Sequence, residues 1–231
     1  MPTIDHANKE ISCKIVYYGP GLCGKTTNLE AIHRDVPGEN KTNLVQLATE
    51  KDRTLFFDFL PVTLGQIKGF RIKFQLYTVP GQVYYNATRR LVLSGVDGLV
   101  YVADSQRSKF QENIDMLVNL RENLAEYRID LDDVPLVMQY NKRDLADIVP
   151  VDELERALNP RKVPSFEAVA VAGTGVKETL RAIATETLTR IGRRSAERSR
   201  QPAAAGSGLV QHRPAAAPAK PTSIFRRAAG T

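Results

Sequence analysis

Short apolar runs alternate with longer stretches of helical periodicity along the first 191 residues of the chain. The runs have the length of β-strands and are rich in β-branched and aromatic residues. Three of them are mainly apolar, which is typical of parallel strands covered on both faces. The pattern predicts strands at 13–18, 54–60, 70–78, 98–104, 136–140 and 166–171.

The stretches between these runs carry apolar residues at the three- to four-residue spacing of amphipathic helices. The longest places Phe110, Ile114, Leu117, Leu120 and Leu124 on one stripe. Strands that alternate with helices predict a single α/β domain, with a mostly parallel sheet of six to seven strands sandwiched by helices. We expect the helices at 25–33, 84–93, 108–127, 152–158 and 174–191.

The net charge is concentrated at one end of the chain. The formal charge is +6, but residues 192–231 alone hold eight basic residues against one acid. The rest of the chain is therefore close to neutral, at −1. The last segment is also rich in Ala, Pro and Arg and poor in large apolar residues, so it cannot bury enough surface to become ordered. We predict a folded domain over 1–191 and a disordered basic tail over 192–231.

Two interpretations of this tail stay open. It is either a solvated extension or an electrostatic contact with an anionic membrane or an acidic partner. Sequence-specific binding of nucleic acid is not expected, because the tail contains no recognition element.

The first predicted strand leads directly into a phosphate-binding motif. Residues 19–26 match G-x-x-x-x-G-K-[ST] between a strand and a helix. The glycines let several backbone N–H groups converge on one phosphate at the helix N-terminus. Lys25 would reach the β- and γ-phosphates, and Thr26 would bind Mg²⁺. The predicted nucleotide-binding residues of this loop are Gly19, Gly21, Leu22, Cys23, Gly24, Lys25, Thr26 and Thr27.

A second motif, Asn141-Lys142-Arg143-Asp144, follows the fifth predicted strand. Open α/β sheets bind ligands at this edge. The Asp144 carboxylate can accept two hydrogen bonds from guanine, whereas adenine offers no such pair of donors. Lys142 would lie along the base, and Asn141 would tie the loop to the phosphate end. The tetrapeptide alone is also a common polar loop, but its position after a phosphate-binding loop favours guanine.

With these motifs the chain resembles a Ras-like small GTPase, and more narrowly the bacterial MglA family of gliding-motility polarity proteins. The similarity is carried by four stretches, at 14–29, 52–61, 77–82 and 139–145. It ends before the tail. The resemblance implies a single P-loop G domain that binds GTP or GDP with Mg²⁺.

The resemblance also implies roles for residues outside the two motifs. Thr54 would place its hydroxyl on Mg²⁺, and Gly81 would offer a backbone N–H to the γ-phosphate. Gln82 would orient the attacking water. Arg53 would act as an arginine finger supplied by the same chain, and such an arginine can raise the hydrolysis rate by about 10³–10⁵. The alternative is that Arg53 is a solvated loop arginine. Ala170 would donate its backbone N–H to guanine O6.

One position departs from the wider superfamily. Ras-like proteins usually have Asp-x-x-Gly where this chain has Thr78-Val79-Pro80-Gly81, and that acid normally holds Mg²⁺ through water. The MglA family shares the threonine. We hypothesise that Asp58, on the strand expected beside 70–78, supplies part of the missing charge. The alternative is that Asp58 faces water on an edge strand.

These features predict a GTP-binding and GTP-hydrolysing switch that controls bacterial cell polarity and motility. The resemblance implies slow hydrolysis until a Roadblock-domain partner, MglB, stimulates it, and it implies polarity or motility effectors. It also implies a cytoplasmic protein concentrated at a cell pole. Two isolated cysteines, Cys13 and Cys23, form no disulfide framework, which fits a reducing cytoplasm.

Two other functions fit the sequence less well. A non-hydrolysing, nucleotide-dependent scaffold of the same fold is favoured by Thr78 and opposed by Gln82 and Arg53. A P-loop nucleotide kinase would need a lid with several phosphate-binding arginines, and no such cluster occurs at 30–190.

Overall fold

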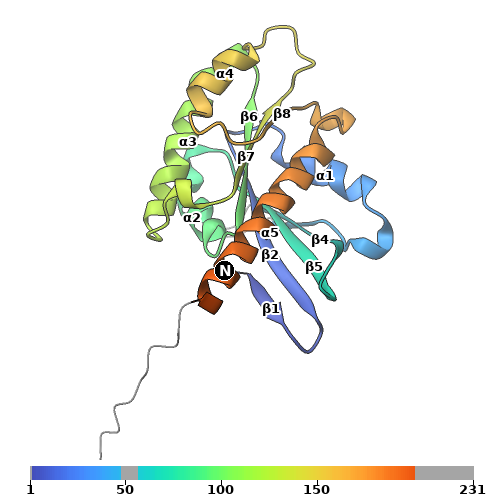
Figure 1. The fold of residues 1–231 in the computed structure, drawn as a ribbon. Coiled ribbons are helices and arrows are strands. Elements are labelled where there is room, and N and C mark those ends of the chain that lie inside the picture. Colours follow the sequence, from blue (N-terminus) through green and yellow to red (C-terminus); the bar gives the residue numbers. More distant parts are fainter. Residues whose placement is uncertain (1, 48–56, 201–231) are drawn as a thin grey trace, which may run out of the picture.

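The computed structural model describes residues 2–47 and 57–200, which form one mixed sheet between two layers of helices (Figure 1). The sheet order is β3-β4-β5-β2-β6-β7-β8, and β1 pairs with β2. From β5 across to β8 the strands are parallel, while β4 pairs antiparallel with β5. The strands are β1 (Thr3–Asp5), β2 (Glu10–Tyr18), β3 (Val45–Leu47), β4 (Phe57–Ile67), β5 (Phe70–Thr78), β6 (Gly98–Asp104), β7 (Leu136–Asn141) and β8 (Ser165–Glu167).

The helices divide between the two faces of the sheet. Those on one face are α2 (Asn86–Leu93), α3 (Phe110–Ala125) and α4 (Val151–Leu158), and those on the other are α1 (Lys25–Asp35) and α5 (Val176–Arg200). Short 3₁₀ turns include η2 (Val83–Tyr85), η4 (Leu131–Asp133) and η5 (Ala170–Ala172).

The central strand β6 shows why both faces need helices. All seven of its residues are buried. Leu99 and Tyr101 pack with the α2–α4 layer, whereas Val100 and Val102 pack with α1 and α5. Burying one such side chain contributes about 1.5–3 kcal/mol. The helices therefore dock on a continuous apolar sheet, and its polar loops are left at the strand ends.

The architecture confirms the predicted α/β fold class. The bounds of β5 and β6 are as predicted, and β2 begins three residues before the predicted start at 13. Two three-residue strands, β1 and β3, bring the sheet to eight strands among the described residues. The predicted strand at 54–60 is observed from Phe57 and continues to Ile67, and its first three residues lie outside the described part.

The prediction of a strand over 166–171 is wrong at its C-terminal end. Strand β8 stops at Glu167, and η5 begins at Ala170. The amide of Val169 donates back to the carbonyl of Thr174, and Gly173 adopts a left-handed conformation with φ 79°. These bonds turn the chain away from the sheet, so the apolar residues there do not extend the strand.

The last helix passes the predicted domain boundary at 191. It ends at Arg200, so residues 192–200, predicted to belong to the tail, are helical. Arg, Ala and Glu are good helix formers and need no buried face to extend a helix that is already anchored. The remaining predicted tail, 201–231, lies outside the described residues.

No helix within the described residues combines the length and the apolar character that crossing a membrane requires.

Candidate nucleotide-binding site

The segment between β2 and α1 is a tight loop that requires glycine at two positions. Gly19 and Gly24 have φ angles of 148° and 100°. A Cβ atom at Gly19 would lie 2.1 Å from the carbonyl oxygen of Val102, and one at Gly24 would lie 2.2 Å from Nδ2 of Asn141. Residues other than glycine rarely adopt these φ angles, and a Cβ atom would clash at both positions. The loop therefore requires both glycines.

Lys25 occupies the inside of the loop. Its Nζ donates to the carbonyl oxygens of Gly19 at 2.9 Å and Pro20 at 2.6 Å, and the side chain is buried. Cys23 beside it is also buried, and burial raises the pKa of its thiol, so the residue acts as a small protonated filler. Leu22, by contrast, is 88% exposed at the rim.

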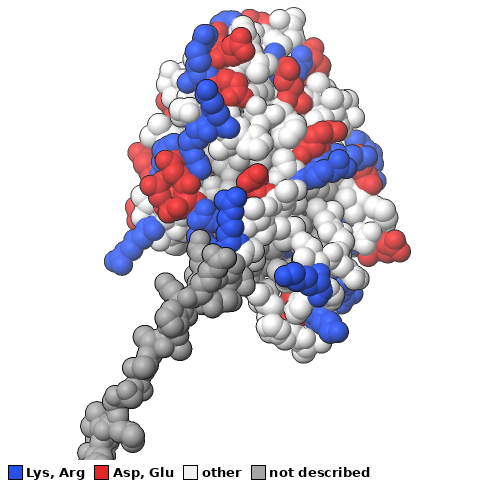
Figure 2. Space-filling model, in the orientation of Figure 1, with Lys and Arg blue, Asp and Glu red and all other residues white. Residues whose placement is uncertain are grey.

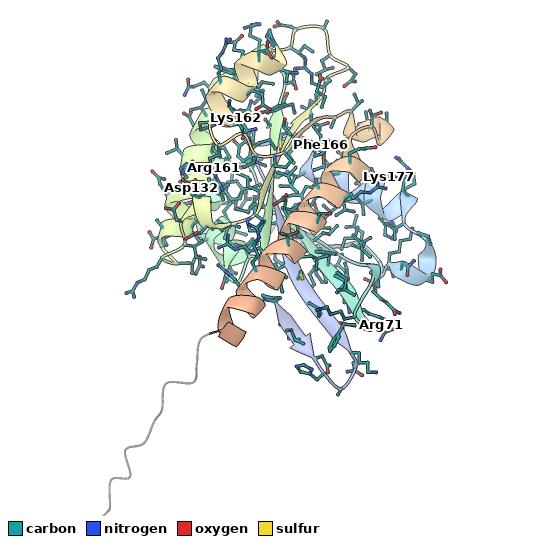
Figure 3. The ribbon with its side chains drawn as sticks, viewed as in Figure 1. Arg71, Asp132, Arg161, Lys162, Phe166 and Lys177 are labelled. Carbon is teal, nitrogen blue, oxygen red and sulfur yellow. The ribbon has the colours of Figure 1, made fainter. Side chains whose placement is uncertain are left out.

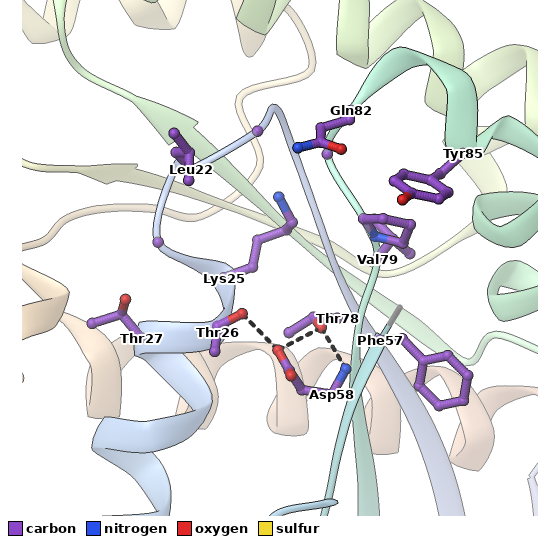
Figure 4. Close-up of a pocket in the computed structure, with 14 residues that line it drawn as sticks. Leu22, Lys25, Thr26, Thr27, Phe57, Asp58, Thr78, Val79, Gln82 and Tyr85 are labelled. Carbon is purple, nitrogen blue, oxygen red and sulfur yellow. Dashed lines mark hydrogen bonds between the residues drawn. The ribbon is translucent and has the colours of Figure 1, made fainter. Parts of the chain in front are cut away.

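Asp58 lies at the centre of a hydrogen-bonded cluster below the loop (Figure 4). Its Oδ2 accepts from the Thr26 hydroxyl at 2.6 Å and from the Thr78 hydroxyl at 2.9 Å. The Thr78 oxygen in turn accepts from the Asp58 amide at 2.8 Å. Asp58 is 9% exposed. The interpretation of Asp58 as an edge acid facing water is therefore wrong, and its carboxylate lies beside the threonine predicted to bind the metal.

A cavity of about 630 Å³ opens between this loop and the segment after β5. It brings together most of the predicted phosphate-facing residues, the pair Asp58 and Thr78 that the sequence had singled out, and four residues to which sequence reasoning gave no role at the site: Phe57, Val79, Pro80 and Tyr85. The predicted residues are Gly21, Leu22, Gly24, Lys25, Thr26, Thr27, Gly81 and Gln82, and the further lining residues are Phe57, Asp58, Thr78, Val79, Pro80 and Tyr85.

The segment after β5 lies directly against the phosphate-binding loop. A Cβ atom on Gly81 would be 2.3 Å from the amide nitrogen of Gly21, so only glycine fits this contact. Gln82 is exposed at the cavity wall, where its Oε1 accepts a hydrogen bond from the hydroxyl of Tyr84.

Arg89, which sequence reasoning missed, supports this segment from beneath. Arg89 lies on α2 and is only 2% exposed. Its NH1 donates to the carbonyl oxygens of Pro80 at 3.2 Å and Gln82 at 2.6 Å. Its Nε donates to Oδ1 of Asn119 on α3 at 3.0 Å. Burial lowers the pKa of the guanidinium. A charged residue on the buried side of a predicted helix was the signal that could have identified it.

The predicted base-binding loop is tied to the phosphate-binding loop through one side chain. Asn141 donates from Nδ2 to the Cys23 carbonyl at 2.8 Å and accepts at Oδ1 from the Ala170 amide at 2.9 Å. Lys142 pairs at 2.7 Å with the fully buried carboxylate of Asp104 at the end of β6. The Asp144 side chain is exposed beyond them.

Two predicted site residues, Arg53 and Thr54, lie outside the described residues. Within the described part no group of three or more His, Cys, Asp or Glu side chains gathers as a metal site. The Thr26 hydroxyl and the Asp58 carboxylate are nevertheless hard oxygen donors 2.6 Å apart at the cavity. Mg²⁺ is bound in proteins by one or two such oxygens together with water and phosphate, so these residues fit the implied ion.

Comparison with known proteins gives two findings. A model of the ADP-ribosylation factor family matches residues 3–187. The chain is also 56% identical over 191 residues to the Mutual gliding-motility protein MglA of Myxococcus xanthus (strain DK1622), an alignment that covers 83% of this chain and 98% of that protein.

Proposed function

The chain belongs to the ADP-ribosylation factor family of small GTPases, and we propose that it binds and hydrolyses GTP as a molecular switch for bacterial cell polarity and gliding motility. The observation that carries this proposal is the cavity that joins the Lys25 loop, the Asp58 cluster and Gln82. The similarity to MglA supports the motility role.

Phosphate binding would begin with a change of partner for Lys25. Its ammonium now donates to two loop carbonyls, Gly19 and Pro20. Charge-assisted bonds to phosphate oxygens are stronger than bonds to neutral carbonyls. The β- and γ-phosphates would therefore draw Lys25 away from the carbonyls, while the loop amides at the start of α1 bind the same phosphates.

The metal would be held by Thr26, Thr54 and, in place of the usual acid, Asp58. When bound, Mg²⁺ supplies positive charge that neutralises the β- and γ-phosphate oxygens. Thr78 cannot supply a negative charge, but its hydroxyl donates to Asp58 Oδ2 at 2.9 Å and orients that carboxylate toward Thr26. The negative charge that β5 lacks at Thr78 would thus come from Asp58 on the neighbouring strand β4.

Guanine selectivity would rest on Asp144. Its exposed carboxylate would accept the two donors of the guanine edge, and Lys142, oriented by Asp104, would pack along the base. The Ala170 amide, now bonded to Asn141, would contact guanine O6.

Hydrolysis would depend on Gln82 and Arg53. Gln82 would orient the attacking water, while Arg53 would stabilise charge that develops on the transferred phosphoryl group. Gly81 touches the phosphate-binding loop at Gly21. A γ-phosphate bound beside Gly21 would therefore shift the 80–82 segment, and such a shift is how GTP changes the surface of a switch protein.

The partners would follow from this switch. Slow intrinsic hydrolysis would be stimulated by a Roadblock-domain activator of the MglB type, and the GTP state would bind polarity or motility effectors. Tyr84, 74% exposed beside Gln82, is suited to such contacts. The protein would act in the cytoplasm and concentrate at a cell pole.

Nucleotide binding by the purified chain tests the proposal. We expect GDP and GTP to bind with Mg²⁺, and ATP to compete at least a hundredfold more weakly. Asp144→Ala should remove most of this preference, while Asp147→Ala, an exposed acid of the same loop, should leave it intact. Equal affinity for ATP and GTP would contradict the assignment. Tight GTP binding without phosphate release would favour the non-hydrolysing scaffold.

A further inference from the structure

A groove of about 590 Å³ lies at the edge of the sheet opposite the nucleotide site. Its walls precede the starts of β6 and β7, whereas the nucleotide loops follow the ends of β2 and β7. The groove lies between β1, the loop after α2, the loop before β7 and the last turns of α5. Its apolar wall residues are Ile4, Val96, Ile129, Val134 and Ile191. Nothing in the proposed GTPase function uses it.

The groove carries carboxylates on the loops before β6 and β7, where Arg128 also lies, and arginines on α5. Asp130 and Asp133 lie in and beside η4, and Arg190 and Arg194 lie on α5. Asp133 is 76% exposed and forms a long ion pair of 3.9 Å with Arg190 across the groove. The nearby Asp132 already pairs with Arg161 at 3.4 Å; both residues are labelled in Figure 3. Figure 2 shows acidic and basic side chains side by side on this end of the molecule. Because the ion pair between Asp133 and Arg190 is long and Asp133 is exposed, the Asp133 carboxylate can still accept a closer cation from an occupant.

The chain itself carries a segment that matches this groove. Residues 201–231 contain few large apolar residues, and the pair Ile224-Phe225 is followed at once by Arg226-Arg227. Two apolar side chains next to two arginines complement an apolar groove that carries carboxylates. The other apolar pair, Leu209-Val210, has no arginine directly beside it.

The geometry of the chain allows this segment to return to the groove. Arg194 lines the groove, and α5 ends at Arg200, about 9 Å further along the helix axis. The 23 residues between Arg200 and Ile224 would span about 25 Å even as a random coil. A tether of this length gives an effective concentration in the millimolar range, so a weak contact is enough.

We propose that residues 224–227 dock intramolecularly in this groove. Ile224 and Phe225 pack against the wall formed by Ile4, Val96 and Ile129, and the two arginines face Asp130 and Asp133. The C-terminal segment thus folds back under the G domain.

A single fluorophore tests the docking in the full-length chain, which contains no tryptophan. We expect Phe225→Trp to give a blue-shifted emission and several-fold weaker quenching by acrylamide than the matched control Leu209→Trp. Both values should be independent of protein concentration. Added to Phe225→Trp, Ile4→Lys should return emission and quenching to those of the control, because it places a cation in the groove wall.

Ile67→Lys is the matched control for the wall. Ile67 and Ile4 are 44% and 47% exposed, so neither change should unfold the domain, but Ile67 lies at the end of β4 away from the groove. It should leave the Phe225→Trp signal unchanged.

Emission of Phe225→Trp equal to that of Leu209→Trp would overturn the proposal. A shift that grows with protein concentration would indicate a second copy instead. One that appears only with anionic vesicles would indicate a membrane contact, and either result would contradict docking within the chain.

Discussion

At the scale of single residues, the structure places a negative charge near Thr78 although Thr78 itself carries none. The sequence lacks an acid at Thr78, and the fold brings Asp58 within 2.9 Å of that position and 2.6 Å of Thr26. A carboxylate and a hydroxyl at these distances form the donor pair that a small hard cation needs. We therefore propose that Thr78 belongs to a different arrangement of residues for the same metal ion.

Asp58→Asn tests this arrangement. The amide keeps the size of the side chain but removes its charge, so we expect Mg²⁺-dependent affinity for GDP to fall by about 10- to 100-fold. Asp35→Asn is the control, because Asp35 pairs with Lys177 at the end of α1, away from the cavity. Titration of Mg²⁺ into nucleotide-loaded protein measures the difference. Unchanged metal dependence in Asp58→Asn would show that Asp58 is not involved.

Gly24→Ala tests the phosphate-binding loop. The new Cβ would combine a left-handed backbone with a 2.2 Å approach to Asn141 Nδ2. Strain of this kind costs about 1–3 kcal/mol, so nucleotide affinity should fall by roughly 10- to 100-fold. Gly38→Ala, which meets nothing within 4 Å, is the control. Fluorescent GDP displacement measures both variants, and equal affinities would contradict the loop geometry.

At the scale of elements, a pair of buried amides joins helices to the sheet. Asn28 on α1 and Gln139 on β7 exchange two hydrogen bonds of 2.8 and 2.9 Å, and Gln139 also donates to the Thr179 hydroxyl on α5 at 3.0 Å. Asn28 and Gln139 are fully buried. The pair therefore links the helix that starts at the phosphate-binding loop to the strand that ends at the base-binding loop.

Gln139→Leu should destabilise the domain by about 1–3 kcal/mol, because it leaves Oδ1 of Asn28 buried without the donor that Gln139 supplies. The double variant Asn28→Leu/Gln139→Leu should recover part of this loss, since both polar groups are then removed. Gln111→Leu, on the exposed side of α3, should change stability by less than about 0.5 kcal/mol. Urea unfolding measures all three. A double variant as unstable as the sum of both single variants would contradict the pairing.

The elements differ in how far sequence could predict them. The bounds of β6 were predicted from a continuous apolar run, and those of β5 from apolar residues that alternate with polar ones. Strands β1 and β3 have three residues each, too few for any periodicity. The end of β8 depends on hydrogen bonds around Val169 that no local pattern encodes.

At the site, too, features that are local in sequence could be predicted, and features that depend on the fold could not. The two glycines and Lys25 could be predicted because the phosphate-binding motif is local in sequence. The Asn28–Gln139 pair is separated by 111 positions, so only the fold could reveal it. The sequence could only suggest that Asp58 lies near Thr78, because that depended on which strands are neighbours in the sheet. Arg89 was missed because helical periodicity does not indicate that a buried arginine will find carbonyl partners.

At the scale of the whole molecule, the nucleotide cavity and the C-terminal end of α5 lie at opposite ends. The nucleotide cavity lies at the carboxyl ends of the parallel strands, where Lys25 and the loop amides would bind phosphates. Helix α5 ends beside the amino end of the chain (Figure 1). The described part of the chain therefore ends far from the residues proposed to bind the nucleotide.

The most direct test of the central claim is single-turnover release of inorganic phosphate from protein preloaded with GTP. We expect the wild-type chain to release phosphate slowly, and Gln82→Leu and Arg53→Ala to bind GTP normally while release nearly stops. A Roadblock-domain activator should accelerate only the wild-type chain. Release from both variants at the wild-type rate would contradict the proposed catalytic roles, and a wild-type chain that binds GTP but never releases phosphate would contradict the switch itself.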